Sequence, residues 1–195
     1  MHLLDRADSA LLIIDLQPNF YPSRRRDVDR SVLTRVSDNA TWLAAVAAAL
    51  DVPTIVTEED PVRNGPTHLS VLSALGQGSQ VLEKTSFGVA GQAEVLSALE
   101  EAGKRTVIIT GGETDICVSH SALGLKLLGY RVVVVSDAVF SPGVAHEHGL
   151  RRLGSCGVEL LSAKQVFYDW LPQLDAVRAF RASYPELAEP IHFNL

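Results

Sequence analysis

Four short segments of this chain are apolar at almost every position, and they constrain its fold more than any other feature. They are ALLIID (10–15), PTIVT (53–57), TVIITG (106–111) and RVVVVSDA (131–138). A strand with one solvated face would alternate polar and apolar residues, whereas a continuous apolar run is typical of a strand buried on both faces of a parallel sheet. Two weaker runs, SQVLEK (79–84) and VELLSA (158–163), predict a sheet of about six strands.

Helical patterns separate these runs. Three of them cover residues 31–50, 91–104 and 115–130, and a fourth covers about 171–184. Alternation of strand and helix predicts an α/β fold, with a doubly wound, mostly parallel, Rossmann-like sheet and helices on both faces. We expect a single domain over residues 1–195, with the C-terminal helix packed on it or on a neighbouring subunit.

Composition favours an ordinary globular protein, with 47% hydrophobic and 21% charged residues and a net charge of −6. The one basic run, residues 23–30, is interrupted by aspartates, so we predict a solvated loop and no nucleic-acid partner. The start of the chain lacks the pattern of a signal peptide, and the apolar stretch 40–50 is about half as long as a membrane span. We therefore expect a cytoplasmic protein without a membrane partner.

Three chemically distinct side chains fall at predicted strand ends. Asp15 ends the first run, Lys84 ends the weak third run, and Cys117 follows the glycine pair after the fourth. Ligands of such sheets bind outside the carboxyl ends of the strands. We therefore predict that the acid, the amine and the thiol meet in one crevice.

This set suits nucleophilic catalysis. A helix N-terminus and a nearby ammonium lower the pKa of a thiol, so we expect Lys84 and the helix start to favour the Cys117 thiolate. Asp15 would move the thiol proton as general base. Backbone N–H groups of the segment GGETDIC (111–117) could stabilise an oxyanion.

Each residue also has an ordinary structural interpretation. Cys117 could be a small buried apolar residue, Asp15 could cap a turn, and Lys84 could be a surface lysine paired with Glu83. We predict that the other cysteine, Cys156, is a small buried apolar residue. Only the combination of all three residues at one edge of the sheet favours a functional site.

The motifs LLIIDLQPNF, EKTSFG and GGETDICVSHSALGLKLLGYRVVVVSDAV resemble those of the isochorismatase-like cysteine hydrolases, over residues from about 8 to about 170. The resemblance implies a catalytic triad of Asp15, Lys84 and Cys117. It also implies a cis peptide bond between Gly112 and Glu113, and an oxyanion hole formed by the amides of Glu113 and Cys117.

Departures from the family pattern narrow the subgroup. Isochorismatases proper lack the cysteine, whereas amidase members use it. Nicotinamidases that bind metal carry an Asp-x-His…His set, but here Glu59 and Pro61 replace its first two residues and only His68 remains. The resemblance is therefore to the small isochorismatase-domain hydrolases of unassigned substrate, and we expect no metal and no cofactor.

Several further residues have two interpretations each. Phe20 and Phe87 would line the substrate pocket or belong to the core, and Gln17 would contact substrate or tie its loop. The carboxylate of Glu113 would bind a polar or cationic substrate group or cap the helix that follows. We expect His120 to pack against the sheet, and His146 has no assigned role.

The residues and the resemblance lead to one functional hypothesis. The chain would be a cysteine hydrolase acting on non-peptide C–N bonds, which cleaves a small amide, ureide or carbamoyl compound through a thioester on Cys117. The alternative is a redox sensor or ligand-binding protein without turnover, since an activated thiolate oxidises readily. The apolar helices and the family resemblance imply a homo-oligomer.

Overall fold

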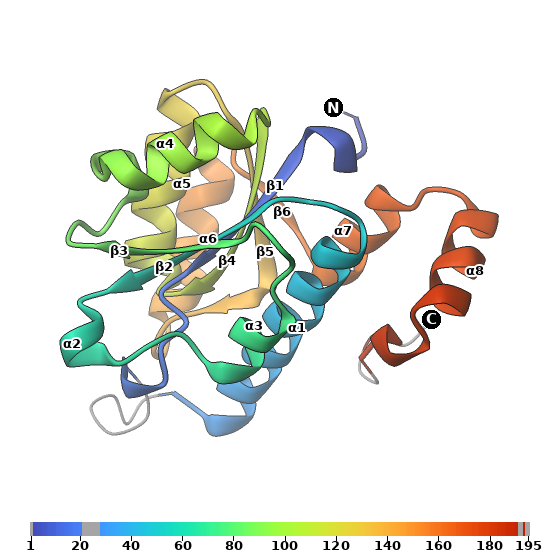
Figure 1. Cartoon of the computed structure of the whole chain (residues 1–195). Helices are drawn as coiled ribbons and strands as arrows, with labels where there is room; N and C mark the ends of the chain where they lie inside the picture. Colours follow the sequence, from blue (N-terminus) through green and yellow to red (C-terminus); the bar gives the residue numbers. More distant parts are fainter. Residues whose placement is uncertain (1, 21–27, 191–192, 194–195) are drawn as a thin grey trace.

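The strands of the protein form one parallel sheet in the order β3-β2-β1-β4-β5-β6 (Figure 1). The strands are β1 (Ser9–Ile14), β2 (Thr54–Glu59), β3 (Gln80–Lys84), β4 (Thr106–Gly112), β5 (Arg131–Phe140) and β6 (Glu159–Leu161). The computed structural model describes residues 2–20, 28–190 and 193. Each of the six predicted runs forms a strand, and the parallel pairing is confirmed.

Helices cover both faces of this sheet, which confirms the doubly wound α/β fold. The α-helices of the described residues are α1 (Arg30–Ala49), α2 (Pro61–Asn64), α3 (Leu69–Ala74), α4 (Ala93–Ala102), α5 (Ser119–Leu127), α6 (Ala145–Ser155), α7 (Ala163–Trp170) and α8 (Leu174–Ser183). Figure 1 shows α4, α5 and α6 on one face and α1, α3 and α7 on the other. Most of the basic run lies outside the described residues, and Arg30 begins α1.

Two apolar cores explain the continuous apolar runs. Successive residues of a strand point to opposite faces, so Leu11 and Ile13 pack with α1, α3 and α7, while Leu12 and Ile14 pack with α4, α5 and α6. All four side chains are fully buried. Every strand position therefore has to be apolar, which is the pattern seen in the sequence.

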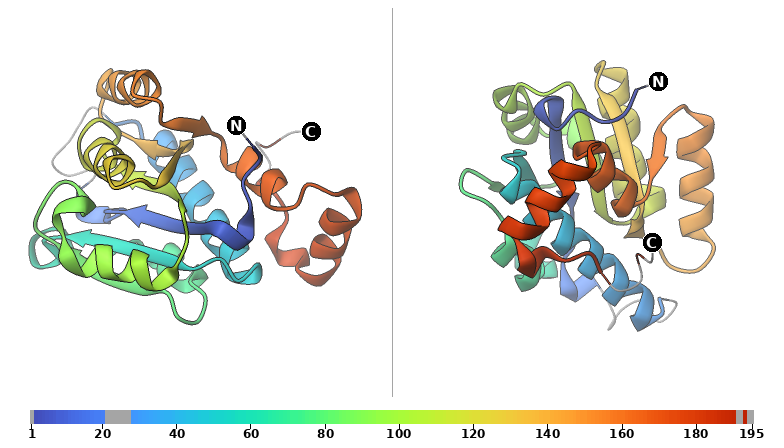
Figure 2. Two further views of the ribbon diagram at one scale, coloured as in Figure 1. Left: turned by 90° about the horizontal axis from the view of Figure 1, so that it is seen from above. Right: turned by 90° about the vertical axis from the view of Figure 1, so that its right-hand side faces the viewer.

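After β6 the chain forms two helices, α7 and α8, where the sequence patterns predicted one. Helix α7 begins with a capping box, in which Ser162 and Gln165 each bond the backbone of the other. Helix α8 then packs on α7, because the ring of Phe180 lies 5.4 Å from that of Phe167. Burial of Val177 and Phe180 stabilises this packing by about 1.5–3 kcal/mol each. Figure 2 shows α8 at the side of the sheet, beyond α7.

The strand order creates a switch point between β1 and β4. Strands β2 and β3 lie on one side of β1, and β4 to β6 lie on the other. A crevice forms outside the carboxyl ends of the strands at such a point. Asp15, Glu59 and Lys84 stand at the ends of β1, β2 and β3, and Cys117 follows β4. The fold thus brings four reactive side chains to one rim.

No helix of the described residues has the length and apolar character that a bilayer span requires.

Candidate active site

Lys84 lies at the centre of the site and is fully buried. Its ammonium Nζ contacts Asp15 Oδ2 at 2.7 Å and Glu59 Oε2 at 3.3 Å, and donates to Ser86 O at 3.0 Å. Three acceptors thus match the three ammonium protons. Burial lowers the pKa of Lys84, but its acidic neighbours, Asp15 first among them, together outweigh this effect and the net shift is upward. The interpretation of Lys84 as a surface residue paired with Glu83 is wrong.

Asp15 follows β1 in a left-handed backbone conformation, with φ of 47°, that aspartate adopts more readily than most residues. Its Oδ1 accepts from Thr57 Oγ1 at 2.8 Å, and its side chain is 2% exposed. Burial raises the pKa of Asp15 to about 6, although the Lys84 ammonium and the Thr57 hydroxyl lower it. The carboxyl group can therefore both take up and release a proton near neutral pH.

Cys117 lies in a π-helical turn, Thr114–Val118, between β4 and α5. The N–H of Val118 donates to Glu113 O, five residues back, at 3.0 Å. Single π turns of this kind are frequent at functional sites. Cys117 Sγ donates to Glu59 Oε2 at 3.5 Å, and the ligand atoms of Cys117, Asp15 and Glu59 all lie within 4.8 Å of one another.

The expected lowering of the Cys117 pKa is wrong. Burial, followed by the charge of Asp15, raises the pKa of the thiol far above its ordinary value, and the Lys84 ammonium does not offset them. Glu59 raises it further. Two carboxylates therefore face one ammonium, and the resting side chain of Cys117 is a neutral thiol.

Gly111 allows β4 to approach β1 at the site. Its φ is 117°, and a Cβ atom at this position would lie 1.9 Å from Ile14 O. No other residue fits without moving the backbone. This contact sets the separation between the end of β1, which carries Asp15, and the turn that carries Cys117.

Glu59 is the site residue that the sequence analysis missed. It was compared only with the metal-binding motif, because β2 was predicted to end at residue 57, two residues before Glu59. Gln17 fixes its backbone: the Gln17 Nε2 donates to Glu59 O at 3.2 Å and to Gly65 O at 2.6 Å, and Glu59 N donates to Gln17 Oε1 at 2.9 Å. Asn64 Nδ2 also donates to Glu59 O, at 2.7 Å. Gln17 therefore ties the end of β2 and the loop that follows it.

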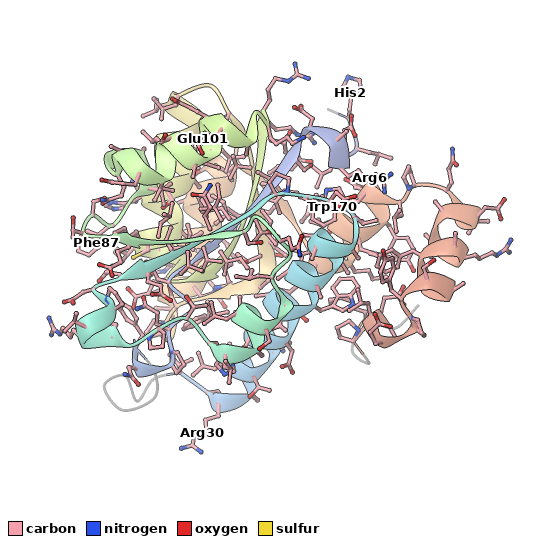
Figure 3. All side chains as sticks on the ribbon, in the orientation of Figure 1. His2, Arg6, Arg30, Phe87, Glu101 and Trp170 are labelled. Atoms are coloured by element: carbon pink, nitrogen blue, oxygen red, sulfur yellow. The ribbon has the colours of Figure 1, made fainter. Side chains whose placement is uncertain are left out.

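The predicted pocket aromatics lie in different surroundings. Phe87 is exposed on the loop after β3 (Figure 3), and its ring forms a T-shaped pair with the His120 ring, with 6.1 Å between centroids. His120 is itself exposed, so the prediction that it packs against the sheet is wrong. Phe20 packs against the core on the α1 side of the sheet.

Glu113 and His146 flank the π turn. Glu113 is buried, and within the described residues its side chain makes no capping hydrogen bond to that turn. His146 Nδ1 lies 2.9 Å from Thr114 Oγ1. Cys156 ends α6 as an exposed free thiol, so the prediction that it is buried is wrong.

The donor atoms at the site were also compared with the needs of a metal ion. Among the described residues, Asp15, Glu59 and Cys117 form a group whose ligand atoms are close enough to hold one. The Lys84 ammonium, however, contacts both carboxylates and already offsets part of the negative charge that would attract a cation. His68 instead bonds Ser70 at the start of α3, with 2.8 Å between its Nδ1 and Ser70 Oγ.

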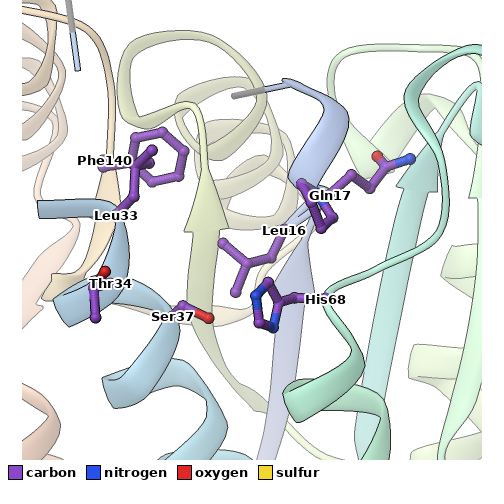
Figure 4. Close-up of a pocket in the computed structure, with 8 residues that line it drawn as sticks. Leu16, Gln17, Leu33, Thr34, Ser37, His68 and Phe140 are labelled. Carbon is purple, nitrogen blue, oxygen red and sulfur yellow. The ribbon is translucent and has the colours of Figure 1, made fainter. Parts of the chain in front are cut away.

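A separate cavity of about 190 Å³ opens on the α1 side of the sheet (Figure 4). It is lined by Leu16, Gln17, Pro18, Leu33, Thr34, Ser37, His68 and Phe140. Figure 4 shows the amide of Gln17 pointing away from the cavity toward β2, where it bonds Glu59. Cys117 packs in the core of the opposite face, so this cavity is not the space above the thiol.

Comparisons of the sequence with known proteins agree on one family. The isochorismatase domain model matches residues 9–165. Isochorismatase domain-containing protein 2 of Danio rerio is 32% identical over 166 residues, which cover 84% of this chain and 79% of the relative. The probable hydrolase YcaC of Escherichia coli is 26% identical over 182 residues, which cover 89% of this chain and 85% of the relative.

Solved structures agree with these matches. The structure of E. coli YcaC, described as an octameric hydrolase of unknown specificity, has a TM-score of 0.79 and covers 95% of this chain and 92% of its own. YcaC from Pseudomonas aeruginosa, solved with hexane-2,5-diol and covalent acrylamide, is 25% identical, with a TM-score of 0.79 and coverage of 95% and 94%. The chain therefore belongs to the isochorismatase domain family of hydrolases.

Proposed function

We propose that the protein is a cysteine hydrolase that cleaves a small amide, ureide or carbamoyl compound through a thioester on Cys117. One observation carries this proposal: the thiol, two carboxylates and a buried ammonium meet at the switch point of the sheet. Asp15, Lys84 and Cys117 would form the catalytic triad. Burying these groups together costs free energy, and sites of this kind are typically functional.

In the first half-reaction, Asp15 takes the proton of the Cys117 thiol as the sulfur attacks the carbonyl carbon. Because the resting thiol is neutral, proton transfer accompanies the attack and no stored thiolate is needed. The tetrahedral intermediate then breaks its C–N bond, and Asp15 returns the proton to the departing amine. The product is a thioester, and Lys84 balances the changing charge on Asp15 throughout.

In the second half-reaction, Asp15 takes a proton from water as its oxygen attacks the thioester carbon. The C–S bond breaks, and the proton returns to the sulfur of Cys117. The sum is hydrolysis of one amide to an acid and an amine. We also propose that the amides of Glu113 and Cys117 stabilise the oxyanion, with the cis peptide bond between Gly112 and Glu113 that the family resemblance implies.

The relatives support parts of this proposal. P. aeruginosa YcaC was solved with covalent acrylamide, and E. coli YcaC is octameric. We propose by analogy that this chain takes a small-molecule substrate and forms a homo-oligomer. We also propose that it works in the cytoplasm, where Cys117 and Cys156 would remain the free thiols seen in the structure.

The redox alternative requires a second thiol that can reach Cys117. Helix α6 touches the π turn at Gly149, where an added Cβ would lie 2.8 Å from Asp115 N. Cys156 stands seven residues further along this helix (156 − 149), which corresponds to about 10 Å. No observation therefore favours this alternative.

An activity screen over small amides, ureides and carbamoyl compounds tests the proposal. We expect ammonia or amine release by the wild type and loss of at least 1,000-fold, roughly the scale of a missing catalytic nucleophile, in Cys117→Ala. Cys156→Ser is the matched control and should keep wild-type activity. Turnover that survives in Cys117→Ala would remove the covalent mechanism.

A further inference from the structure

Glu59 differs from the other three groups of the site because it faces outward. The side chains of Asp15 and Lys84 are 2% and 0% exposed, and Cys117 is 3% exposed. The side chain of Glu59 is 22% exposed. A compound that approaches the thiol from solvent therefore meets the Glu59 carboxylate.

The two oxygens of Glu59 have different surroundings. Oε2 accepts from both Lys84 Nζ, at 3.3 Å, and Cys117 Sγ, at 3.5 Å. No donor among the described residues bonds Oε1, which leaves a strong acceptor beside the nucleophile. A carboxylate in this position can receive an N–H group and repels a second anion.

The backbone of Glu59 is held rigidly, which suits a role in recognition. Gln17 bonds both its N–H and its carbonyl oxygen, and Asn64 adds a second bond to the carbonyl. Its pairing with Lys84 in the register of β2 and β3 fixes the side-chain direction. The carboxylate is thus pre-organised toward the thiol, as a specificity group requires.

We propose that Glu59 is a specificity-determining residue: it receives an N–H group of the substrate beside the reacting carbon and excludes compounds that carry a carboxylate there. This inference rests on the proposed function and narrows its substrates to neutral or cationic amides, ureides and carbamoyl compounds. An amide N–H next to the scissile carbonyl would replace the thiol as the donor to Glu59 when the sulfur attacks.

Stoichiometric alkylation tests the proposal without any turnover. Iodoacetamide and iodoacetate have nearly the same shape, but the first carries a carboxamide and the second a carboxylate. With either reagent the sulfur gives up its proton to solvent, an S–C bond forms and iodide leaves. The exposed Cys156 of the same chain is the internal reference, and peptide mass spectrometry reads both cysteines.

We expect the ratio of iodoacetamide to iodoacetate rates to be at least tenfold larger at Cys117 than at Cys156. In Glu59→Gln the ratio at Cys117 should fall at least tenfold, toward that of Cys156. Any change in the thiol pKa affects both reagents equally and cancels in the ratio. Glu83→Gln, an exposed neighbour of Lys84, is the matched control and should leave the ratio unchanged.

Three results would overturn the proposal. One is equal ratios at the two cysteines of the wild type, a comparison that needs no variant to fold. Another is a folded Glu59→Gln protein with an unchanged ratio. The third is Cys117 unlabelled by both reagents when Cys156 is fully labelled, since a small amide must reach the thiol. If the activity screen fails while the ratios follow the prediction, the recognition by Glu59 stands and the hydrolysis does not.

Discussion

Replacement of Lys84 by methionine tests how the buried charges of the site depend on one another. Methionine keeps much of the volume of the lysine side chain but removes the ammonium that contacts Asp15 Oδ2 and Glu59 Oε2. The two carboxylates then face each other and the thiol without the cation. Removing one partner of a buried ion pair typically costs about 3–5 kcal/mol of folding free energy.

The pH dependence of this loss follows from Asp15. Its folded pKa, about 6, exceeds the ordinary value of 3.8, so folding favours the protonated form and stability falls as pH rises up to the folded pKa. Without Lys84 the folded pKa is higher still, and the fall continues above pH 6. At pH 6 the wild type still holds about half of this proton, and it loses the rest by pH 8 while the variant keeps its own. At about 1.36 kcal/mol per proton and pH unit, the difference between the two proteins grows by about 2.3 kcal/mol over this range.

Urea unfolding at pH 6, 7 and 8 measures both quantities. We expect Lys84→Met to lose about 4 kcal/mol relative to the wild type at pH 8 and about 1–2 kcal/mol at pH 6. Lys126→Met, at an exposed position, is the control and should change stability by less than about 0.5 kcal/mol at each pH. A loss in Lys84→Met that matches this control, or that does not vary with pH, would refute the assigned charge balance.

Three further predictions concern the residues around the triad. The acid limb of kcat/KM should fall through a pKa of about 6, because Asp15 acts in its ionised form, and Glu59→Gln should move this limb to lower pH by removing a charge that raises the pKa of Asp15. Gly111→Ala should lower stability by more than about 2 kcal/mol in thermal unfolding, whereas Gly154→Ala, where a Cβ meets its nearest atom at 3.7 Å, should be tolerated; equal effects would contradict the close approach of β1 and β4. Gln17→Met removes three hydrogen bonds to the loop after β2 and should cost about 2–4 kcal/mol in urea unfolding; a loss under about 1 kcal/mol would contradict its loop-tying role.

The fold could be predicted from the sequence because its strands are buried on both faces. Residues such as Leu11 and Leu12 pack into different cores, so the runs are apolar throughout and easy to recognise. Helix α7 was missed although the capping box at Ser162 and Gln165 is visible in the sequence. Its signal is short, since the helix directly follows the three-residue strand β6.

The sequence predicted which residues form the candidate site better than it predicted their protonation states. Asp15, Lys84 and Cys117 could be named because strand ends converge in this fold class. Glu59 could not, because its contact with Lys84 depends on the register of β2 and β3, which the two segments do not encode locally. The sign of the Cys117 pKa shift depends on burial and on this second carboxylate, and both are tertiary properties.

The exposure of single residues on helices was also hard to predict. Cys156 and His120 were expected inside, but the first lies at the exposed end of α6 and the second on the outer side of α5, against Phe87. Apolar periodicity is weak in α5, so a small shift of helix phase decides which face His120 takes. Cys156 lies just beyond the last residue of α6, where the helical pattern no longer sets the exposure of a side chain. The exposure of such residues has to be taken from the structure.

Carbamoylation by p-nitrophenyl carbamate gives the most direct measurement of the central claim. The compound is neutral, carries the N–H group expected at Glu59, and releases coloured nitrophenolate when its carbamoyl group is transferred. The account predicts a burst of one nitrophenolate per chain, a carbamoyl group located on Cys117 by peptide mass spectrometry, and no burst in Cys117→Ala. A burst that persists in Cys117→Ala, or a modified Cys156 beside an unmodified Cys117, would contradict it.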